Sequence, residues 1–523
     1  MAKVISGNFR IHNAEQFVEA LSETSATNLY MFIGGPVVWP DEASPPTPSD
    51  SVANTSYAHW RDMISAKKLD GSDVSQVVKR YNWTTNTAYT AYTDTNADLH
   101  SNTFYVVTTS DHVYKCVQNN INSGNSTAQP TGTSTKIIET VDGYKWKYLY
   151  TISPEAKLKF VTTDYIPVQK VGSIDDGSNQ FDVEDVSIDG SIDIINKTAN
   201  GTSFLFDEGI LASVQNTSVI TLAASANTTD GIYVNSTVYI TNNASRGEQS
   251  VISAYDGAQR RATLVNAFSV LANTSSGYQL APTANVNGDG SGAKARCVGN
   301  SSTQVTKIEI TKVGSNYTTA NVTVYGNSSH GSGTTGTVII GPPGGHGSNA
   351  PIELGGHYVI VSARLSGNED SKFTTSCDYR KVGLLRDPKQ YSNSEAFFTG
   401  SQADQAFTLS LTGVTGTFGF PPATANDEVI YQGGTLGTST ANGTFVDFRD
   451  GTSIRITDVL GTFVANSTVN TITGNTSGAT ATVSTITSPD IKRYSGEILY
   501  VENRTAITRS EDQLEDIKLV LEF

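Results

Sequence analysis

Apolar residues near the N-terminus have the spacing of a helix followed by a buried strand. Four of them recur at the i, i+3, i+4 and i+7 positions of a helix with one buried face, namely Ala14, Phe17, Val18 and Leu21. Asn13 and Gln16, at the start of this pattern, resemble a capping box. The apolar run 29–33 predicts a buried strand, closed by Gly34 and Gly35.

A second helix is predicted to begin near Ser51, after the extended Pro-rich connector 45–48. Its apolar stripe would consist of Tyr57, Trp60 and Ile64. All four tryptophans lie in the first 172 residues, at Trp39, Trp60, Trp83 and Trp146. Large aromatic side chains dominate core packing, so we expect a substantial core in this part of the chain.

Between residues 173 and 349 the sequence pattern changes. Here short runs of alternating apolar and polar residues, typical of strands, are separated by Gly, Asn, Ser and Thr. Residues 251–255 and 261–265 flank Asp256-Gly257 and predict a hairpin or short meander. Residues 307–310 and 321–325 predict further short strands. No helical pattern is visible here, so the region is predicted to be all-β.

The alternation of core-like and Gly/Thr-rich stretches predicts five segments and a mainly β fold with some α. These are an N-terminal core part (1–172), an inserted β-rich region (173–350), a middle core part (351–401), a second inserted β module (402–488) and C-terminal core strands (489–523). In the last segment, apolar residues from Ile517 to Phe523 alternate with Lys518 and Glu522, the period of a strand with one buried face.

The two inserted tracts share one short pattern. Asp, Gly, Arg, Thr and Val recur at identical offsets, at Asp256, Gly257, Arg261, Thr263 and Val265 and at Asp450, Gly451, Arg455, Thr457 and Val459. Duplication and convergence of Gly/Thr-rich meanders both explain the match. The sequence leaves this choice open.

Composition and charge exclude several classes of protein. The 523 residues include 35 Lys and Arg against 50 Asp and Glu, a net charge of −15, which argues against nucleic acid as the main partner. Charged residues make up only 16%, too few for a coiled coil or a charge-driven disordered tail. No signal peptide or apolar run long enough to span a bilayer is visible. Three separated cysteines, Cys116, Cys297 and Cys377, indicate reduced thiols and synthesis in a reducing cytosol.

The sequence offers little evidence for catalysis or cofactor binding. Residues 331–336 fit G-x-G-x-x-G by letter, but no helix pattern follows them, so we interpret them as a loop. There is no Gly-Lys dipeptide, G-x-S-x-G elbow or H-E-x-x-H, and the seven histidines are scattered. Residues 285–290 begin like a calcium loop, but Arg296 occupies the position of its bidentate Glu. The acidic run 175–193 is interpreted as a solvated linker. We therefore predict no catalytic, cofactor-binding or metal-binding residues.

Two motifs are more specific than composition: residues 142–150, Asp-Gly-Tyr-Lys-Trp-Lys-Tyr-Leu-Tyr, and residues 493–504 near the C-terminus. Together they resemble the baseplate wedge subunit encoded by gene eight of T-even-type contractile-tailed phages. The resemblance extends over residues 1–172, 351–400 and 489–523, although Thr505-Ala506 stand where a proline pair is expected. Its structural, non-catalytic signature consists of Asp142, Gly143, Tyr144, Trp146, Arg493, Ser495, Gly496, Glu497, Tyr500, Glu502, Asn503 and Arg504.

The resemblance implies a virion protein without catalytic activity or cofactor. It implies a homodimer with a β-sandwich-like core and peripheral helices, which contacts other baseplate wedge proteins and neither binds nucleic acid nor inserts into a membrane. The alternative is a glycan-binding or glycan-degrading tail spike, suggested by the β insertions with aromatic residues such as Tyr317 and Tyr325.

The charged residues of the C-terminal motif suggest a further hypothesis. Arg493 and Arg504 would pair with Glu497 and Glu502 in a clamp that fixes strand 498–501 against the final strand, 517–523. An ordinary hairpin with solvated charges is the alternative.

Overall fold

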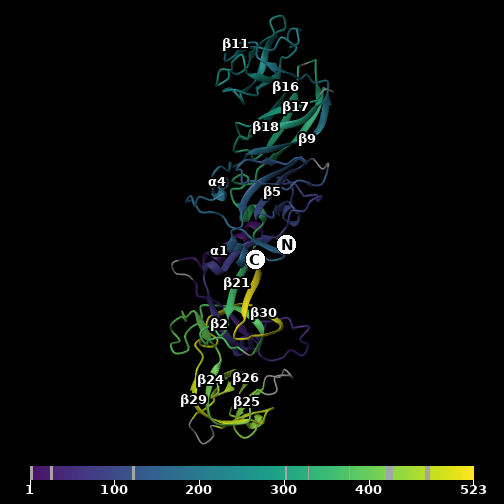
Figure 1. Cartoon of the computed structure of the whole chain (residues 1–523). Coiled ribbons are helices and arrows are strands. Elements are labelled where there is room, and N and C mark those ends of the chain that lie inside the picture. Colours follow the sequence, from purple (N-terminus) through teal and green to yellow (C-terminus); the bar gives the residue numbers. More distant parts are fainter. Residues whose placement is uncertain are drawn as a thin grey trace. The chain divides into compact units, whose positions relative to one another are not determined.

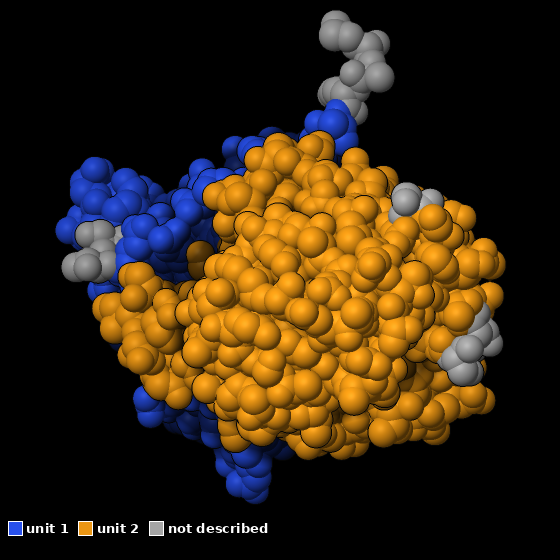
Figure 2. All heavy atoms as spheres, turned by 90° about the horizontal axis from the view of Figure 1, so that it is seen from above, with its two compact units in different colours: residues 1–77, 155–161, 356–523 blue, residues 78–154, 162–355 orange. Residues whose placement is uncertain are grey.

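The computed structural model describes residues 4–23, 27–120, 124–300, 303–327, 329–375, 377–419, 428–465 and 471–523. The described chain is mostly β with five α-helices, so the predicted mainly β fold class is confirmed (Figure 1). It divides into two compact units, which Figure 2 colours separately. Unit 1 comprises residues 1–77, 155–161 and 356–523, and unit 2 comprises residues 78–154 and 162–355.

Unit 1 contains a five-stranded antiparallel sheet. Its order is β23 (Gln402–Asp404), β2 (Met63–Leu69), β1 (Leu29–Gly34), β22 (Asp378–Arg386) and β30 (Glu497–Thr508). The central strand β1 is buried along its whole length, which confirms the buried strand predicted from the apolar run. The sheet joins segments that are hundreds of residues apart in the sequence.

A second sheet in unit 1 pairs β31 (Leu514–Glu522) with β21 (Tyr358–Ser366) and β21 with β3 (Val74–Lys79). Ile517 and Leu519 are buried while Asp516 is exposed, so the predicted alternation of the last strand is confirmed. One apolar cluster contains residues of both sheets, including Met31, Val382, Val359 and Leu519.

A closed six-stranded barrel completes unit 1. Its strands, in order around the barrel, are β24 (Phe407–Thr415), β27 (Ser453–Gly461), β26 (Ala441–Asp450), β25 (Val429–Gln432), β28 (Thr471–Gly474) and β29 (Thr480–Thr487). The barrel has its own apolar core, with Leu409, Ile430 and Val483 fully buried. Strand β23, from the start of the same sequence tract, pairs instead with β2.

The helices of unit 1 differ in their limits from the sequence predictions. Helix α1 (Gly7–Glu19) begins well before Asn13, because the Ser6 hydroxyl accepts a hydrogen bond from the Phe9 amide and caps it there. Helix α2 (Ala53–Arg61) ends before Ile64, which lies in β2. Trp60 is buried as predicted, whereas Tyr57 is exposed. The short helix α3 spans Pro154–Phe160.

Unit 2 contains a four-stranded sheet with the order β4 (Tyr105–Val107), β5 (His112–Asn119), β7 (Tyr144–Thr151) and β6 (Ile138–Glu139). Helix α4 (Asn179–Asp185) contacts β7 and buries Val183 in the core of this sheet. The prediction that residues 173–349 lack helices is therefore wrong. The Ser178 hydroxyl caps α4 by accepting a hydrogen bond from the Phe181 amide at 3.0 Å.

The rest of unit 2 is β structure around two further apolar cores. A ten-stranded sheet contains β11 (Ser213–Asn216), β12 (Val219–Thr221), β15 (Arg261–Leu264), β14 (Gln249–Asp256), β13 (Ser236–Ile240), β16 (Gly277–Gly288), β17 (Lys294–Gly299), β18 (Val305–Lys312), β10 (Asp207–Ile210) and β19 (Ala320–Tyr325). Strand β20 (Ser332–Ile340) pairs with β9 (Ile192–Thr202). The remaining elements are β8 (Tyr165–Pro167) and α5 (Ala350–Leu354). The hairpin predicted around Asp256-Gly257 is confirmed by the pairing of β14 with β15.

The two copies of the shared sequence pattern both lie in hairpins, β14–β15 in the ten-stranded sheet and β26–β27 in the barrel. Their arginines have different surroundings. Arg455 is buried and forms a bidentate pair with Asp447, whereas Arg261 is half-exposed beside Asp256. The two hairpins also differ in register, since Asp256 lies opposite Arg261 whereas Asp450 lies opposite Ser453. A duplication therefore remains a hypothesis.

Candidate functional site

The first signature motif forms the turn that leads into β7 in unit 2. The Asp142 carboxylate accepts hydrogen bonds from the backbone amides of Thr127 (2.7 Å), Ala128 (2.9 Å) and Tyr144 (3.2 Å). The hydroxyls of Ser126 and Thr140 also donate to it. Asp142 thereby ties its own turn to the separate loop 126–128.

The hydrogen bonds around Asp142 determine its charge state. Partial burial raises the pKa of this carboxyl, but the donors on Thr140, Ala128, Thr127 and Tyr144 outweigh burial and lower the pKa to about 2. Gly143, the next residue, has a φ of +81°, and a Cβ at this position would fall 2.8 Å from the Asn120 side chain. Backbone conformation and space therefore both favour glycine here.

The aromatic residues of the first motif pack into the core of the four-stranded sheet. Tyr144 and Trp146 are buried with stacked rings 5.8 Å apart, and Tyr89 packs edge-on against Trp146. The Tyr144 hydroxyl donates to the Gly124 carbonyl at 2.9 Å. These contacts stabilise the sheet and its loops, and they bring no nucleophile or general base to an open surface.

The second signature motif begins with a turn that leads into β30 in unit 1. Gly496 has a φ of +75°, and a Cβ there would fall 2.4 Å from the Arg386 carbonyl oxygen. The Ser495 hydroxyl accepts from the Lys389 amide at 2.9 Å and donates to the Lys492 carbonyl at 2.6 Å. The motif therefore anchors the start of β30 to the segment that follows β22.

The charged residues of this motif do not form the predicted clamp. Glu497 pairs with Arg386 on β22, and the Arg493 guanidinium lies 5.2 Å from the Phe407 ring centroid. Arg504 does pair with Glu502, with Nε 2.8 Å from Oε1, but both residues are on β30. The clamp hypothesis is wrong because β30 pairs with β22 and the final strand β31 pairs with β21, in a different sheet.

Residues of β30 instead hold the Pro-rich connector. Trp39 Nε1 donates to the Arg504 carbonyl at 2.8 Å, and Asn503 Nδ2 donates to the Pro46 carbonyl at 2.7 Å. The Tyr500 hydroxyl donates to Glu502 at 2.9 Å. Burial, and then this hydrogen bond, raise the pKa of Tyr500 to about 12, so its hydroxyl stays protonated at neutral pH.

Sequence reasoning missed a buried ion pair in unit 2 between Lys115 on β5 and Glu353 on α5. Their side chains are 1% and 2% exposed, and Glu353 also accepts from the Gly347 amide at 2.7 Å. Burial lowers the Lys115 pKa, although Glu353 opposes this shift. The sequence did contain a signal for this pair, because Lys115 lies inside the apolar run 113–117. A lysine buried in such a strand requires a partner of opposite charge.

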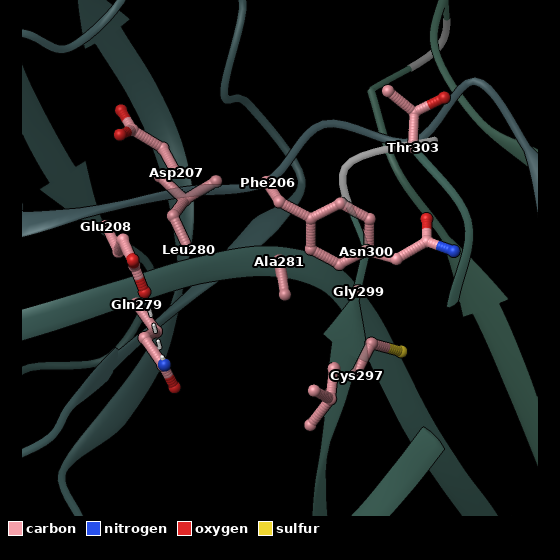
Figure 3. Close-up of a pocket in the computed structure, with 11 residues that line it drawn as sticks. Phe206, Asp207, Glu208, Gln279, Leu280, Ala281, Cys297, Gly299, Asn300 and Thr303 are labelled. Atoms are coloured by element: carbon pink, nitrogen blue, oxygen red, sulfur yellow. Dashed lines mark hydrogen bonds between the residues drawn. The ribbon is translucent and has the colours of Figure 1, made fainter. Parts of the chain in front are cut away.

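An open pocket of about 410 Å³ lies in unit 2, among residues 206–208, 279–281, 297–300 and 303 (Figure 3). The Phe206 ring packs against Gly299, where a Cβ would fall 2.2 Å from a ring carbon. Asp207 accepts a hydrogen bond from the Tyr233 hydroxyl at 2.6 Å, and Asn300 adds an amide to the lining. The pocket thus combines an aromatic surface with carboxylate and amide groups.

Three general features complete the description. Within the described residues, no group of three or more His, Cys, Asp or Glu side chains is arranged to hold a metal ion. No described helix is long and apolar enough to cross a membrane. Cys116, Cys297 and Cys377 are free thiols, and all three are buried.

Comparison with known families gives one match, which lies mostly in unit 2. Residues 106–188 match the family model described as bacteriophage T4, Gp8. The match contains the sheet strands β5, β6 and β7, the Asp142 turn and helix α4, so the predicted resemblance to the gene-eight family is confirmed over this range. No curated protein matches the chain significantly.

The Gp8 match supports a structural role in a phage baseplate, and therefore in the virion tail, in association with other baseplate proteins. The C-terminal motif, residues 493–504, lies outside the matched range. Its assignment as a family signature remains a prediction from the sequence.

Proposed function

We propose that this protein is a non-enzymatic wedge subunit of a contractile phage tail baseplate, made in the host cytoplasm and incorporated into the virion. The observation that carries this proposal is the Gp8 match over residues 106–188. The motif residues within it support a structural interpretation, because Asp142 and Trp146 have their contacts inside the fold. The proposal includes contacts with neighbouring wedge proteins.

The proposed wedge subunit is a homodimer with a β-sandwich-like core. The shared apolar cluster of the β1 and β21 sheets is compatible with such a core, since packed sheets bury their facing side chains together. We also retain as part of this proposal the five-segment division, in which residues 173–350 and 402–488 are insertions into a core.

The native mass of the purified full-length chain tests this assembly state. A dimer has a mass of about 111 kDa, twice the 55.7 kDa of one chain, and this is the expected result from light scattering. A trimer of about 167 kDa, three times 55.7 kDa, would contradict the wedge proposal, because a threefold spike uses different interfaces from a twofold dimer.

A second candidate function is glycan binding by a tail spike, with the pocket of Figure 3 as the site. Its aromatic ring with neighbouring carboxylate and amide groups is a suitable surface for a sugar. A screen of bacterial surface glycans tests this alternative with Phe206→Ala and, as a control, the exposed Phe397→Ala in unit 1. Binding that only Phe206→Ala abolishes would favour the spike, and no binding by the unaltered chain would reject it.

A further inference from the structure

Strand β30 forms an open edge of the five-stranded sheet in unit 1. Its backbone at residues 497–503 pairs with β22 on one side, and no described segment pairs with it on the other. The open stretch ends at Arg504, whose carbonyl oxygen already accepts a hydrogen bond from Trp39. An unpaired edge strand presents N–H and C=O groups on which a further strand can form.

A groove of about 510 Å³ follows this edge. One wall is residues 496–501 of the β30 segment, and the other consists of Ser56, His59 and Trp60 of helix α2, with residues 48–50 completing the lining. A groove between an edge strand and a neighbouring element suits strand addition. In that mode main-chain hydrogen bonds supply affinity and pockets for alternate side chains supply specificity.

The groove is lined by both polar and apolar groups, and its apolar part lies where β30 faces Trp60. Trp60 is only 5% exposed and belongs to an apolar cluster against which Ile498 and Val501 pack. Burial and the nearby Lys381 charge lower the pKa of His59, so its ring is neutral at physiological pH. An apolar side chain can therefore enter between β30 and α2 without facing a charge from the helix wall.

The rim of the groove is acidic. Asp50 is exposed and forms no ion pair within the described ranges of the chain. Glu497, on the strand wall, is 63% exposed and forms an ion pair with Arg386. With a net charge of −15 over the whole chain, this rim favours a positively charged partner segment.

We propose that this groove binds an extended, basic segment of another protein, which adds as a strand to β30 and inserts an apolar side chain between β30 and α2. This inference goes beyond the wedge proposal and does not depend on it, because it follows from the geometry of unit 1. It also explains part of the second motif, since Gly496, Glu497 and Tyr500 shape the strand wall.

A synthetic peptide with alternating basic and β-branched residues, Lys-Val-Lys-Val-Lys-Val, is the probe. We expect saturable binding to the full chain by calorimetry, weakened by salt, with slowed amide exchange confined to residues 497–503. Two control peptides separate the contributions. The same sequence with N-methylated backbone amides cannot complete a strand ladder, and Glu-Val-Glu-Val-Glu-Val has the opposite charge, so neither should bind.

Two variant pairs test the location of binding. Ser56→Phe fills the groove and should weaken binding at least about tenfold, whereas Asn54→Phe, on α2 but outside the lining, should not. Asp50→Lys should weaken binding and its salt dependence, whereas Glu395→Lys, another exposed acid of unit 1, should not. If Ser56→Phe fails to fold, the Asp50 pair decides.

Three results would overturn the proposal. They are no binding of the basic peptide, equal binding of its N-methylated form, and binding that none of the groove variants changes. A fourth result would assign the groove to a different occupant. If residues 497–503 are already protected in the unaltered chain and Ser56→Phe reduces the native mass to that of one chain, a second copy of this protein occupies the groove.

Discussion

At the residue scale, the Asp142 side chain holds its own turn and the loop 126–128 together through hydrogen bonds. Five hydrogen bonds converge on its carboxylate, three from backbone amides and two from hydroxyls. Four of these five hydrogen bonds are partly buried, so removing the carboxylate leaves donors that water reaches only in part. An unsatisfied donor costs up to about 1–3 kcal/mol when it is buried. These hydrogen bonds give Asp142 a stabilising role in its turn.

We predict that Asp142→Ala lowers the free energy of unfolding at pH 7 by about 1–3 kcal/mol, measured by denaturant titration. Because the folded pKa of about 2 lies below that of an unfolded aspartate, the contribution is complete above about pH 4 and is lost as the pH falls towards 2. The difference between the two proteins should therefore shrink at pH 2.5. The exposed Asp94→Ala is the control, and a difference independent of pH would contradict this role.

Gly143 allows a second residue-scale prediction because Gly132 is a matched control. Both have positive φ, +81° and +86°, but a Cβ meets Asn120 at position 143 and open space at position 132. Alanine should cost about 1–2 kcal/mol at each position from the left-handed backbone. Gly143→Ala should cost more than Gly132→Ala by the additional clash, measured as Tm differences. Equal losses would show that the Asn120 side chain moves away without cost.

At the element scale, the Lys115–Glu353 pair connects β5 of the Gp8-matched segment to α5, which lies more than 150 residues after that segment. We predict that Lys115→Met or Glu353→Gln alone lowers the free energy of unfolding by about 3–5 kcal/mol, because each leaves one buried charge unpaired. The double variant should lose less than the sum of the two. Denaturant unfolding of all four proteins gives this coupling energy.

The surface pair Arg364 and Asp516 is the control for this cycle, since both side chains are about half exposed. Its coupling energy should be below about 1 kcal/mol, as for other solvated ion pairs. A coupling for Lys115 and Glu353 that is no larger than this would contradict the importance of the buried pair.

Elements whose signal is local were predictable from the sequence. The apolar run of β1, the alternation in β31 and the turn between β14 and β15 each depend on a few consecutive residues. Helix α4 was not predictable, since it has only seven residues and Val183 is its one buried apolar side chain. Val183 packs against residues of the four-stranded sheet, a contact that the local sequence pattern does not show. The start of α1 was misplaced because Ser6 caps it before the apolar pattern begins.

The ion-pair partners of charged residues were harder to predict than the helices and strands. The clamp hypothesis correctly paired Arg504 with Glu502 but assumed that neighbouring strands in the sequence pair in the sheet. Strand β22, more than a hundred residues earlier, takes that position beside β30 and supplies Arg386 for Glu497. Sheet order depends on contacts between distant segments, which residue spacing alone does not encode.

At the scale of the whole molecule, one segment of the chain matches a known family model, and most of the β structure lies outside that segment. Residues 106–188 match the T4 Gp8 family, and the barrel and the ten-stranded sheet lie outside that match. From the sequence, the net charge and the lack of catalytic motifs favoured a structural protein. Two short motifs indicated a resemblance to this family. Only the first motif lies in the matched range.

The measurement that tests the wedge assignment most directly is the location and copy number of this chain in purified virions of the phage that encodes it. Quantitative mass spectrometry of isolated tails, with antibody labelling in electron micrographs, gives both. We expect labelling at the baseplate and two copies in each wedge. Absence from the tail, or three copies at each labelled projection with none in the wedges, would contradict the assignment.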